Sequence, residues 1–230
     1  MIKNIFLDLD DTILDFQKGE RVAICDALSA IGIRPINRIV DRYIEINIAS
    51  WRALERGELT RDKVLYGRFE KLLSELGSDS DPIAAQGIYQ EILSRQHQFM
   101  PGGLELLQGL AKSGKYSLFI ATNGIPEVQY PRIDDSGIRH FFKKIFISYD
   151  FGIGKPKKEF FDKCFEMIEN FSHEETIIVG DSLTSDIKGG INAGIRTCHF
   201  NPKALPYTEI TPDYTINDLS ELIPLLDSIE

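Results

Sequence analysis

The sequence has few of the features that mark secreted, membrane-spanning or disulfide-rich proteins. Its three cysteines, Cys25, Cys164 and Cys198, lie far apart and form no C-x-x-C pair, so we expect buried free thiols in a reducing compartment. No stretch approaches the roughly 20 apolar residues of a membrane-spanning helix. The N-terminus lacks the apolar stretch and cleavage site of a signal peptide. These absences predict a cytoplasmic protein.

Positive charge is also scarce. Lys and Arg number 26 against 35 Asp and Glu, which gives a net charge of −9. Such a chain has no general attraction for nucleic-acid polymers or for anionic membranes. A short cluster at Lys155, Lys157 and Lys158 still allows a local site for one small phosphate. We therefore expect a small-molecule partner, and a monomer or a small homo-oligomer.

Short runs rich in Ile, Val and Phe predict the buried strands of a parallel sheet. The runs span residues 5–7, 118–121, 144–147, 176–179 and 197–200. Amphipathic segments of helix length lie between them, at residues 104–113, 158–169 and 185–193. This alternation predicts an α/β fold with a Rossmann-like, doubly wound parallel sheet.

Residues 15–97 interrupt the alternation, because four helical patterns follow one another there without a strand-like run. The third pattern ends at Gly77, and Asp81 and Pro82 open the fourth as N-cap and first-turn residues. We therefore expect an all-helical cap domain at 15–97, inserted into an α/β core of residues 1–14 and 98–230.

Polar residues follow three of the predicted strands, where an open parallel sheet carries its functional side chains. They are Asp8, Asp10 and Thr12; Thr122, Asn123 and Gly124; and Asp181, Ser182 and Asp186. If these strands are neighbours, several carboxylates meet, and each pair about 4 Å apart repels by about 4 kcal/mol at an effective dielectric of about 20. Such a cluster needs a cation. Oxygen ligands without clustered His or Cys favour Mg²⁺.

The D-x-D spacing of Asp8 and Asp10 lets them share the ion by a side chain and a backbone carbonyl at the end of a strand. Asp8 lies nearest the strand and is the predicted nucleophile, forming an aspartyl-phosphate. Asp10 lies further out and is the predicted acid/base. Thr122, Asn123 and Lys155 are predicted to bind the phosphate.

Four motifs in this order resemble those of the haloacid-dehalogenase superfamily, and the resemblance spans nearly the whole chain. The motifs are DLDDT at 8–12, TNG at 122–124, GKP at 154–156, and GDS at 180–182 with Asp186. The resemblance implies Asp8 as nucleophile and Asp10 as acid/base, with Thr122 and Lys155 holding the phosphate. It also implies Mg²⁺ at Asp8, Asp10, Asp181 and Asp186, where Asp186 acts directly, through water, or by orienting Lys155. Asp11 stands where many members have glycine, and Asp too adopts turn conformations.

A narrower resemblance concerns substrate. The stretch 122–129 with Arg132, Ser136 and Gly137, together with Trp51, Glu55 and Gly57, is similar to the bacterial pyrimidine 5′-nucleotidase branch. This implies nucleoside monophosphates such as dUMP and dTMP as substrates. Phe16, Tyr43 or Trp51 would then stack on the base.

Other functions have to be weighed against the same set of acids. Sugar phosphates and phosphoglycolate remain alternative substrates, and a β-phosphoglucomutase-like phosphotransfer remains an alternative reaction. The predicted residues bind only the phosphate group that all these substrates share. A metal-independent 2-haloacid dehalogenase needs the nucleophile but not Asp10 or the metal acids. A phospho-receiver module needs neither a cap nor the D-x-D pair. The four histidines are isolated in sequence and are expected to be structural or surface residues.

Overall fold

The computed structural model describes residues 1–207 and 209–229, and within them the core is one parallel sheet of six strands. Its strand order is β3-β2-β1-β4-β5-β6. The strands are β1 (Asn4–Leu7), β2 (Ser117–Thr122), β3 (Phe142–Ile147), β4 (Thr176–Gly180), β5 (Arg196–Phe200) and β6 (Tyr214–Ile216). The five predicted strands are confirmed. Sequence reasoning missed β6, because three residues are too few to show a period.

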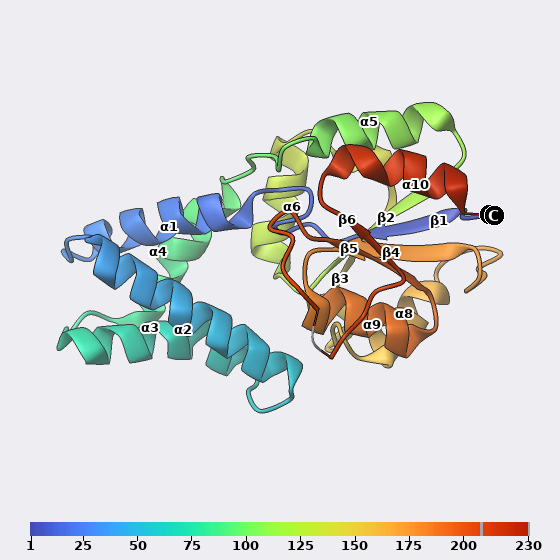
Figure 1. Ribbon diagram of the computed structural model, residues 1–230. Helices are drawn as coiled ribbons and strands as arrows, with labels where there is room; N and C mark the ends of the chain where they lie inside the picture. The colour runs from blue at the N-terminus through green and yellow to red at the C-terminus, as the bar shows by residue number, and fades with distance from the viewer. Residues whose placement is uncertain (208, 230) are drawn as a thin grey trace.

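Helices cover both faces of the sheet, as the doubly wound prediction requires (Figure 1). One face carries α5 (Gly103–Ser113), α6 (Pro126–Asp135) and α10 (Leu222–Ser228); the other carries α8 (Lys158–Phe165) and α9 (Lys188–Ala193). Shorter turns are η1 (Arg139–Phe141), α7 (Ser148–Phe151), η2 (Leu183–Ile187) and η3 (Leu219–Glu221). The prediction that the helix at 158 continues to residue 169 is wrong, because Met167 and Ile168 form tighter turns with Cys164 and Phe165. Among the described helices, none has both the length and the apolar character needed to cross a membrane.

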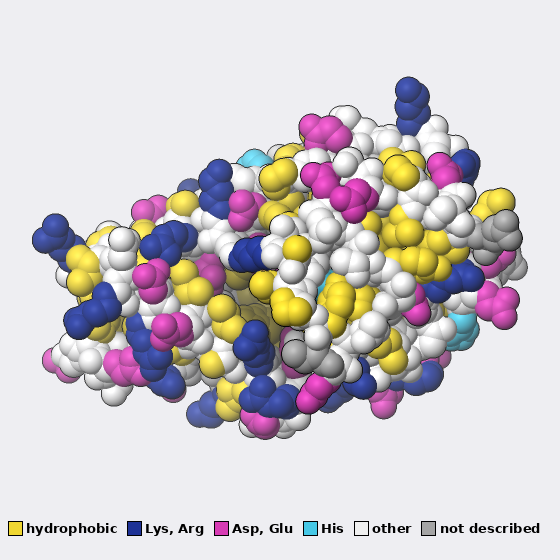
Figure 2. All heavy atoms as spheres, viewed as in Figure 1, with side chains coloured by type: hydrophobic (Ala, Val, Ile, Leu, Met, Phe, Trp, Pro, Cys, Tyr) yellow, Lys and Arg dark blue, Asp and Glu magenta, His cyan; other side chains and the backbone are white. Residues whose placement is uncertain are grey.

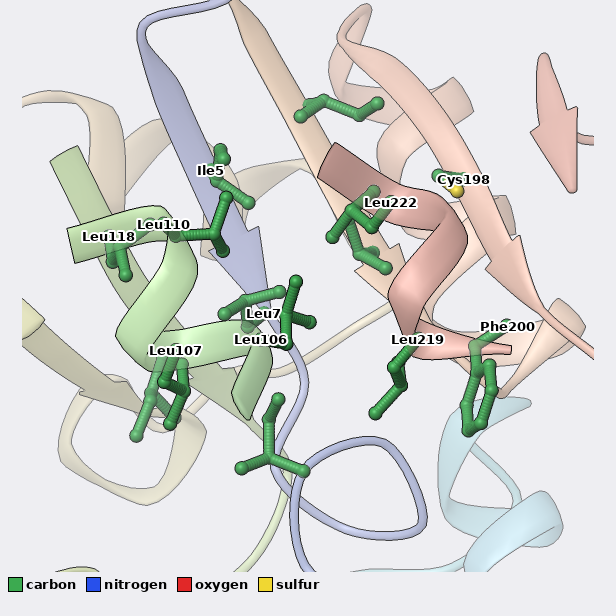
Figure 3. Packing of buried hydrophobic residues seen from close by; sticks show 14 of the residues in the cluster. Ile5, Leu7, Leu106, Leu107, Leu110, Leu118, Cys198, Phe200, Leu219 and Leu222 are labelled. Atoms are coloured by element: carbon green, nitrogen blue, oxygen red, sulfur yellow. The ribbon is translucent and has the colours of Figure 1, made fainter. Parts of the chain in front are cut away.

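The alternation of side chains along β1 divides the core in two. Ile5 and Leu7 point to one face and pack with α5 and α10, as Figure 3 shows around Leu107 and Leu222. Phe6, between them in sequence, points to the other face and joins an aromatic cluster under α8. Burial on both faces explains why these strands read as continuous apolar runs.

Four helices form a separate body beside the sheet, which we call the cap (Figure 1). They are α1 (Phe16–Ala30), α2 (Asn37–Glu55), α3 (Arg61–Leu76) and α4 (Pro82–Ser94). Gly77 ends α3 at a φ of 62°, and the Asp81 side chain caps α4, as the sequence indicated. The two segments that join the cap to the core lie side by side, with Leu14 bridged to Phe99. The domain limits at 15 and 97 stay a prediction.

Candidate active site

The sheet order brings together the loops that carry the predicted site. Because β1 lies between β2 and β4, the residues that follow these strands meet at one edge of the sheet. Asp8, Asp181 and Asp186 each place one carboxylate oxygen there, and these oxygens all lie within 4.8 Å of one another. Thr12 Oγ1 donates a hydrogen bond to the Asp181 carboxylate, at 3.4 Å.

Lys155 lies at the centre of this cluster and is 3% exposed. Its Nζ donates to Asp8 Oδ1 and Asp186 Oδ1, each at 2.6 Å, and to the Ala121 carbonyl at 2.5 Å. Burial alone would lower the pKa of Lys155, but the charges of Asp186 and Asp8 and their hydrogen bonds raise it above its usual value. The side chain is therefore a fixed ammonium ion.

The acids outnumber this single ammonium. Burial raises the pKa of Asp8 to about 8, and the charges of Asp186 and Asp10 add to the effect while Lys155 opposes it. Burial raises the pKa of Asp181 well above its usual value, and the charges of Asp8 and Asp186 raise it further. Three clustered carboxylates, those of Asp8 and Asp186 buried and that of Asp181 half-buried, with one cation are the setting in which a divalent ion is stabilising. The oxygen-only donors therefore fit the predicted Mg²⁺.

Asp186 and Asn123 both contact Lys155. Asp186 accepts from Lys155 through Oδ1 and from the Ser182 backbone N–H through Oδ2 at 3.1 Å. These contacts agree with a role in orienting Lys155, and the predicted contact of Asp186 with the metal, direct or through water, stays a prediction. Asn123 holds the Lys155 backbone from both sides, since Oδ1 accepts from its N–H at 2.9 Å and Nδ2 donates to its carbonyl at 2.8 Å. The Asn123 side chain is thus engaged, and only its backbone N–H is left for the predicted phosphate contact.

The Asp10 carboxylate is not among the clustered acids. It forms an ion pair with Arg132 Nη1 and accepts from Gln129 Nε2 at 2.7 Å. The same Gln129 nitrogen donates to Thr122 Oγ1 at 2.8 Å, which links the acid/base candidate to the phosphate-binding candidate. Both oxygens of the carboxylate have partners, so the backbone carbonyl is the atom through which Asp10 would contact the metal.

The sequence analysis used Gln129 and Arg132 only for the resemblance to the nucleotidase branch and gave them no role in the site, although both are 1% exposed and join it. Their spacing of three residues places them on one face of α6, which was the available signal. Arg132 Nε also donates to the Gln96 carbonyl at 2.7 Å, in the segment that returns from the cap. This arginine therefore fixes Asp10 relative to the cap–core connection.

The turn after β1 has the geometry that its sequence suggested. Asp11 has a φ of 57°, in the left-handed region that Asp tolerates better than most residues. Its carboxylate accepts from the Gln17 backbone N–H at 3.0 Å and so connects the turn to α1.

His199, expected to be structural, supports the site from β5, because its Nε2 lies 2.8 Å from the Asp181 carbonyl.

A cavity of about 920 Å³ lies between the cap and the core, where Figure 2 shows the surface hollowed. Asp8, Asp10, Lys155 and Asp181 line it from the core, among others, and Phe16 and Trp51 line it from the cap. The prediction for Tyr43 is wrong. Its side chain is completely buried among the cap helices, with ring centres 5.0 Å from Phe69 and 5.3 Å from Tyr89.

Two polar contacts join the cap to the core beside this cavity. Arg61 Nη2 donates to Ser148 Oγ at 2.8 Å, and its Nη1 donates to the carbonyls of Asn123 and Gly124. Glu55 accepts from Thr184 Oγ1 at 2.8 Å. Sequence reasoning predicted neither contact, because each joins residues that are distant in the chain. Together they hold the cap over the acidic cluster.

Comparisons with known proteins agree with this geometry. The model of the haloacid dehalogenase-like hydrolase family matches residues 2–194. YfnB of Bacillus subtilis is 43% identical over 98% of this chain and 95% of its own, and its magnesium-bound crystal structure matches with a TM-score of 0.93 over 98% and 99% of the two chains. The pyrimidine 5′-nucleotidase PynA of Streptococcus pneumoniae is 37% identical over 98% and 95%. A glyceraldehyde 3-phosphate phosphatase of Pyrococcus furiosus is 32% identical over 98% and 93%.

Proposed function

The chain belongs to the haloacid dehalogenase-like hydrolases, and we propose that it is a Mg²⁺-dependent phosphomonoesterase that works through an aspartyl-phosphate on Asp8. One observation carries this proposal. The Asp8 carboxylate is buried against the Lys155 ammonium and shares a 4.8 Å cluster with Asp181 and Asp186. A nucleophile placed between a fixed cation and a divalent-ion site suits attack on a phosphate.

In the first step, Asp8 attacks phosphorus while the bond to the ester oxygen breaks, and Asp10 protonates the departing alkoxide. In the second, Asp10 accepts a proton from a water molecule, whose oxygen displaces Asp8 from phosphorus and releases inorganic phosphate. Lys155 and the Thr122 hydroxyl stabilise the phosphoryl oxygens. Mg²⁺, when bound, adds charge neutralisation at these oxygens.

Nucleoside 5′-monophosphates are the substrates that we propose. A cavity of about 920 Å³ lies at the upper end of the range for pockets that enclose a ligand of drug size. The aromatic rings of Phe16 and Trp51 line it and suit a base. Similarity to a pyrimidine 5′-nucleotidase supports this choice, whereas similarity to a glyceraldehyde 3-phosphate phosphatase keeps a sugar phosphate as the second candidate.

A panel of phosphomonoesters assayed with Mg²⁺ and with EDTA tests the proposal. We expect hydrolysis of nucleoside monophosphates with Mg²⁺ and a loss of about 1,000-fold or more in EDTA, because the acidic cluster then has no divalent ion to balance it. Added Mg²⁺ should restore the rate. Activity that survives EDTA would contradict the metal site, and equal kcat/KM values for nucleotides and sugar phosphates would contradict the nucleotidase assignment.

Replacing Arg132 by methionine is expected to lower kcat for p-nitrophenyl phosphate by about 10- to 100-fold, because Asp10 loses the partner that fixes its carboxylate. Steady-state kinetics and circular dichroism would measure the rate and the fold. Arg139→Met is the matched control, since Arg139 forms an exposed ion pair with Asp134 on the surface. An Arg132→Met enzyme with the kcat of the Arg139→Met enzyme would show that Arg132 does not position Asp10.

A further inference from the structure

A line of buried polar side chains crosses the cap and takes one residue from each of its four helices. Asn47 Nδ2 on α2 donates to Glu20 Oε1 on α1 at 2.5 Å, and Arg68 Nη1 on α3 donates to Asn47 Oδ1 at 2.5 Å. Arg68 also donates twice to Gln86 Oε1 on α4, at 3.2 and 3.0 Å. None of the four is more than 4% exposed.

Burial of these polar and charged side chains costs desolvation free energy, which a purely structural element could avoid. Burial raises the pKa of Glu20 to about 7, although the hydrogen bond from Asn47 and the charge of Arg68 oppose the effect. Glu20 has no direct ion pair among the described residues, because Asn47 stands between it and Arg68. Apolar side chains would join four helices without this desolvation cost. The arrangement therefore suits a binding site better than a packing contact.

The line opens onto the cavity that holds the acidic cluster. Glu20, Asn47 and Arg68 all line that cavity together with Asp8. Glu20 is 2% exposed, and its second carboxylate oxygen, Oε2, takes no hydrogen bond from any described residue. Asn47 Nδ2 uses one of its two N–H groups on Glu20. The cavity is thus lined by a residue with a free acceptor and by its neighbour with a free donor.

Apolar side chains form a large part of the cavity wall on the cap side. Phe16, Ile44, Trp51, Leu65 and Leu93 line the same cavity from the cap. A sugar chain would have to bury its hydroxyl groups against these side chains, which is unfavourable without partners. A flat ring with one hydrogen-bonding edge fits both the walls and the polar pair. Nucleobases have such edges, because each places an N–H donor beside an acceptor, as at N3 and O4 of uracil or N4 and N3 of cytosine.

We propose that Glu20 and Asn47 form the subsite that binds the hydrogen-bonding edge of the substrate's nucleobase. This inference rests on the proposed function, because the phosphate group of the same nucleotide occupies the Asp8 end of the cavity. Glu20 Oε2 accepts from the N–H of the base, N3–H in uracil or N4–H in cytosine, and Asn47 Nδ2 donates to the adjacent acceptor, O4 in uracil or N3 in cytosine. Arg68 positions Asn47 for this contact.

Glu20→Gln tests the subsite with little change in shape. The glutamine keeps an oxygen for the Asn47 bond but replaces the free acceptor by an N–H donor, which opposes the donor of the base. We expect the ratio of kcat/KM for UMP or CMP to that for ribose 5-phosphate to fall by about 10- to 100-fold. The affinity for unphosphorylated uridine or cytidine, measured by calorimetry, should fall in parallel. Glu91→Gln is the matched control, since Glu91 lies on the cap surface.

The outcomes separate this subsite from the proposed function. A fall in the ratio with Glu20→Gln but not with Glu91→Gln supports the subsite. A wild-type enzyme that prefers nucleotides, with a ratio that Glu20→Gln leaves unchanged, overturns the subsite and keeps the nucleotidase. A wild-type enzyme without any preference for nucleotides overturns the nucleotidase, and the subsite with it. Unfolding curves of both variants show whether a change in rate reflects folding.

Discussion

Asp8→Asn is expected to lower kcat for Mg²⁺-dependent phosphate release by about 10⁴-fold or more. An amide oxygen is a poor nucleophile, and the variant also removes a negative charge from the ion site. Every other group of the cluster stays in place, because Lys155 keeps Asp186 and the Ala121 carbonyl as partners. Steady-state assays with a colorimetric phosphate readout would measure the loss.

Asp11→Asn is the matched control for this variant. Asp11 follows the same strand, and asparagine tolerates its left-handed backbone and can accept the same hydrogen bond from Gln17. We expect its kcat to stay within about threefold of the wild type, since its side chain contacts none of the cluster acids. Wild-type activity in a folded Asp8→Asn enzyme would refute the nucleophile assignment.

Lys155→Met is expected to lower the free energy of unfolding in EDTA by about 3–5 kcal/mol, because it leaves the buried carboxylates of Asp8 and Asp186 without their cation. It should also abolish activity, since the fixed ammonium no longer stabilises the phosphoryl group. Mg²⁺ should recover part of the lost stability by supplying positive charge to the same acids. Urea unfolding with EDTA and with Mg²⁺ would measure both effects.

Lys157→Met provides the comparison, because Lys157 is exposed two residues away. We expect it to change the free energy of unfolding by no more than about 0.5 kcal/mol. If Lys155→Met proved as stable in EDTA as Lys157→Met, Lys155 would not be the counterion of the two acids. The electrostatic account of the site would then fail.

The sequence predicted the features that are local or follow from strand order. The apolar runs identified β1, β2 and β4 as strands, and the polar residues at their ends gave Asp8, Thr122 and Asp181 as candidates. The structure confirms that the three strands are neighbours, which the sequence analysis had only assumed. The rule for parallel sheets was sufficient for these three candidates, because Asp8 and Asp181 directly follow β1 and β4 and Thr122 ends β2. Lys155 comes later, after α7, and its prediction depended on the turn and motif that contain it. The cap followed from helical periodicity in the same way.

Contacts between distant segments could not be predicted. Arg132 meets Asp10 across 122 residues, and this depends on how α6 packs on the sheet. Tyr43 and Trp51 lie on the same helix, yet only Trp51 reaches the cavity, because the other cap helices surround Tyr43. The packing of neighbouring helices decides which side of an apolar helix faces a ligand. The sequence pattern of that one helix does not show which side this is.

The transfer of a phosphoryl group to Asp8 is the central claim, and trapping that intermediate tests it most directly. Enzyme mixed with Mg²⁺ and excess substrate would be quenched in acid within milliseconds, digested and analysed by mass spectrometry. We expect the peptide that contains Asp8 to carry one phosphoryl group, which is absent from the Asp8→Asn enzyme. A phosphoryl group on any other residue, or a catalytically active enzyme that is never phosphorylated, would contradict the account.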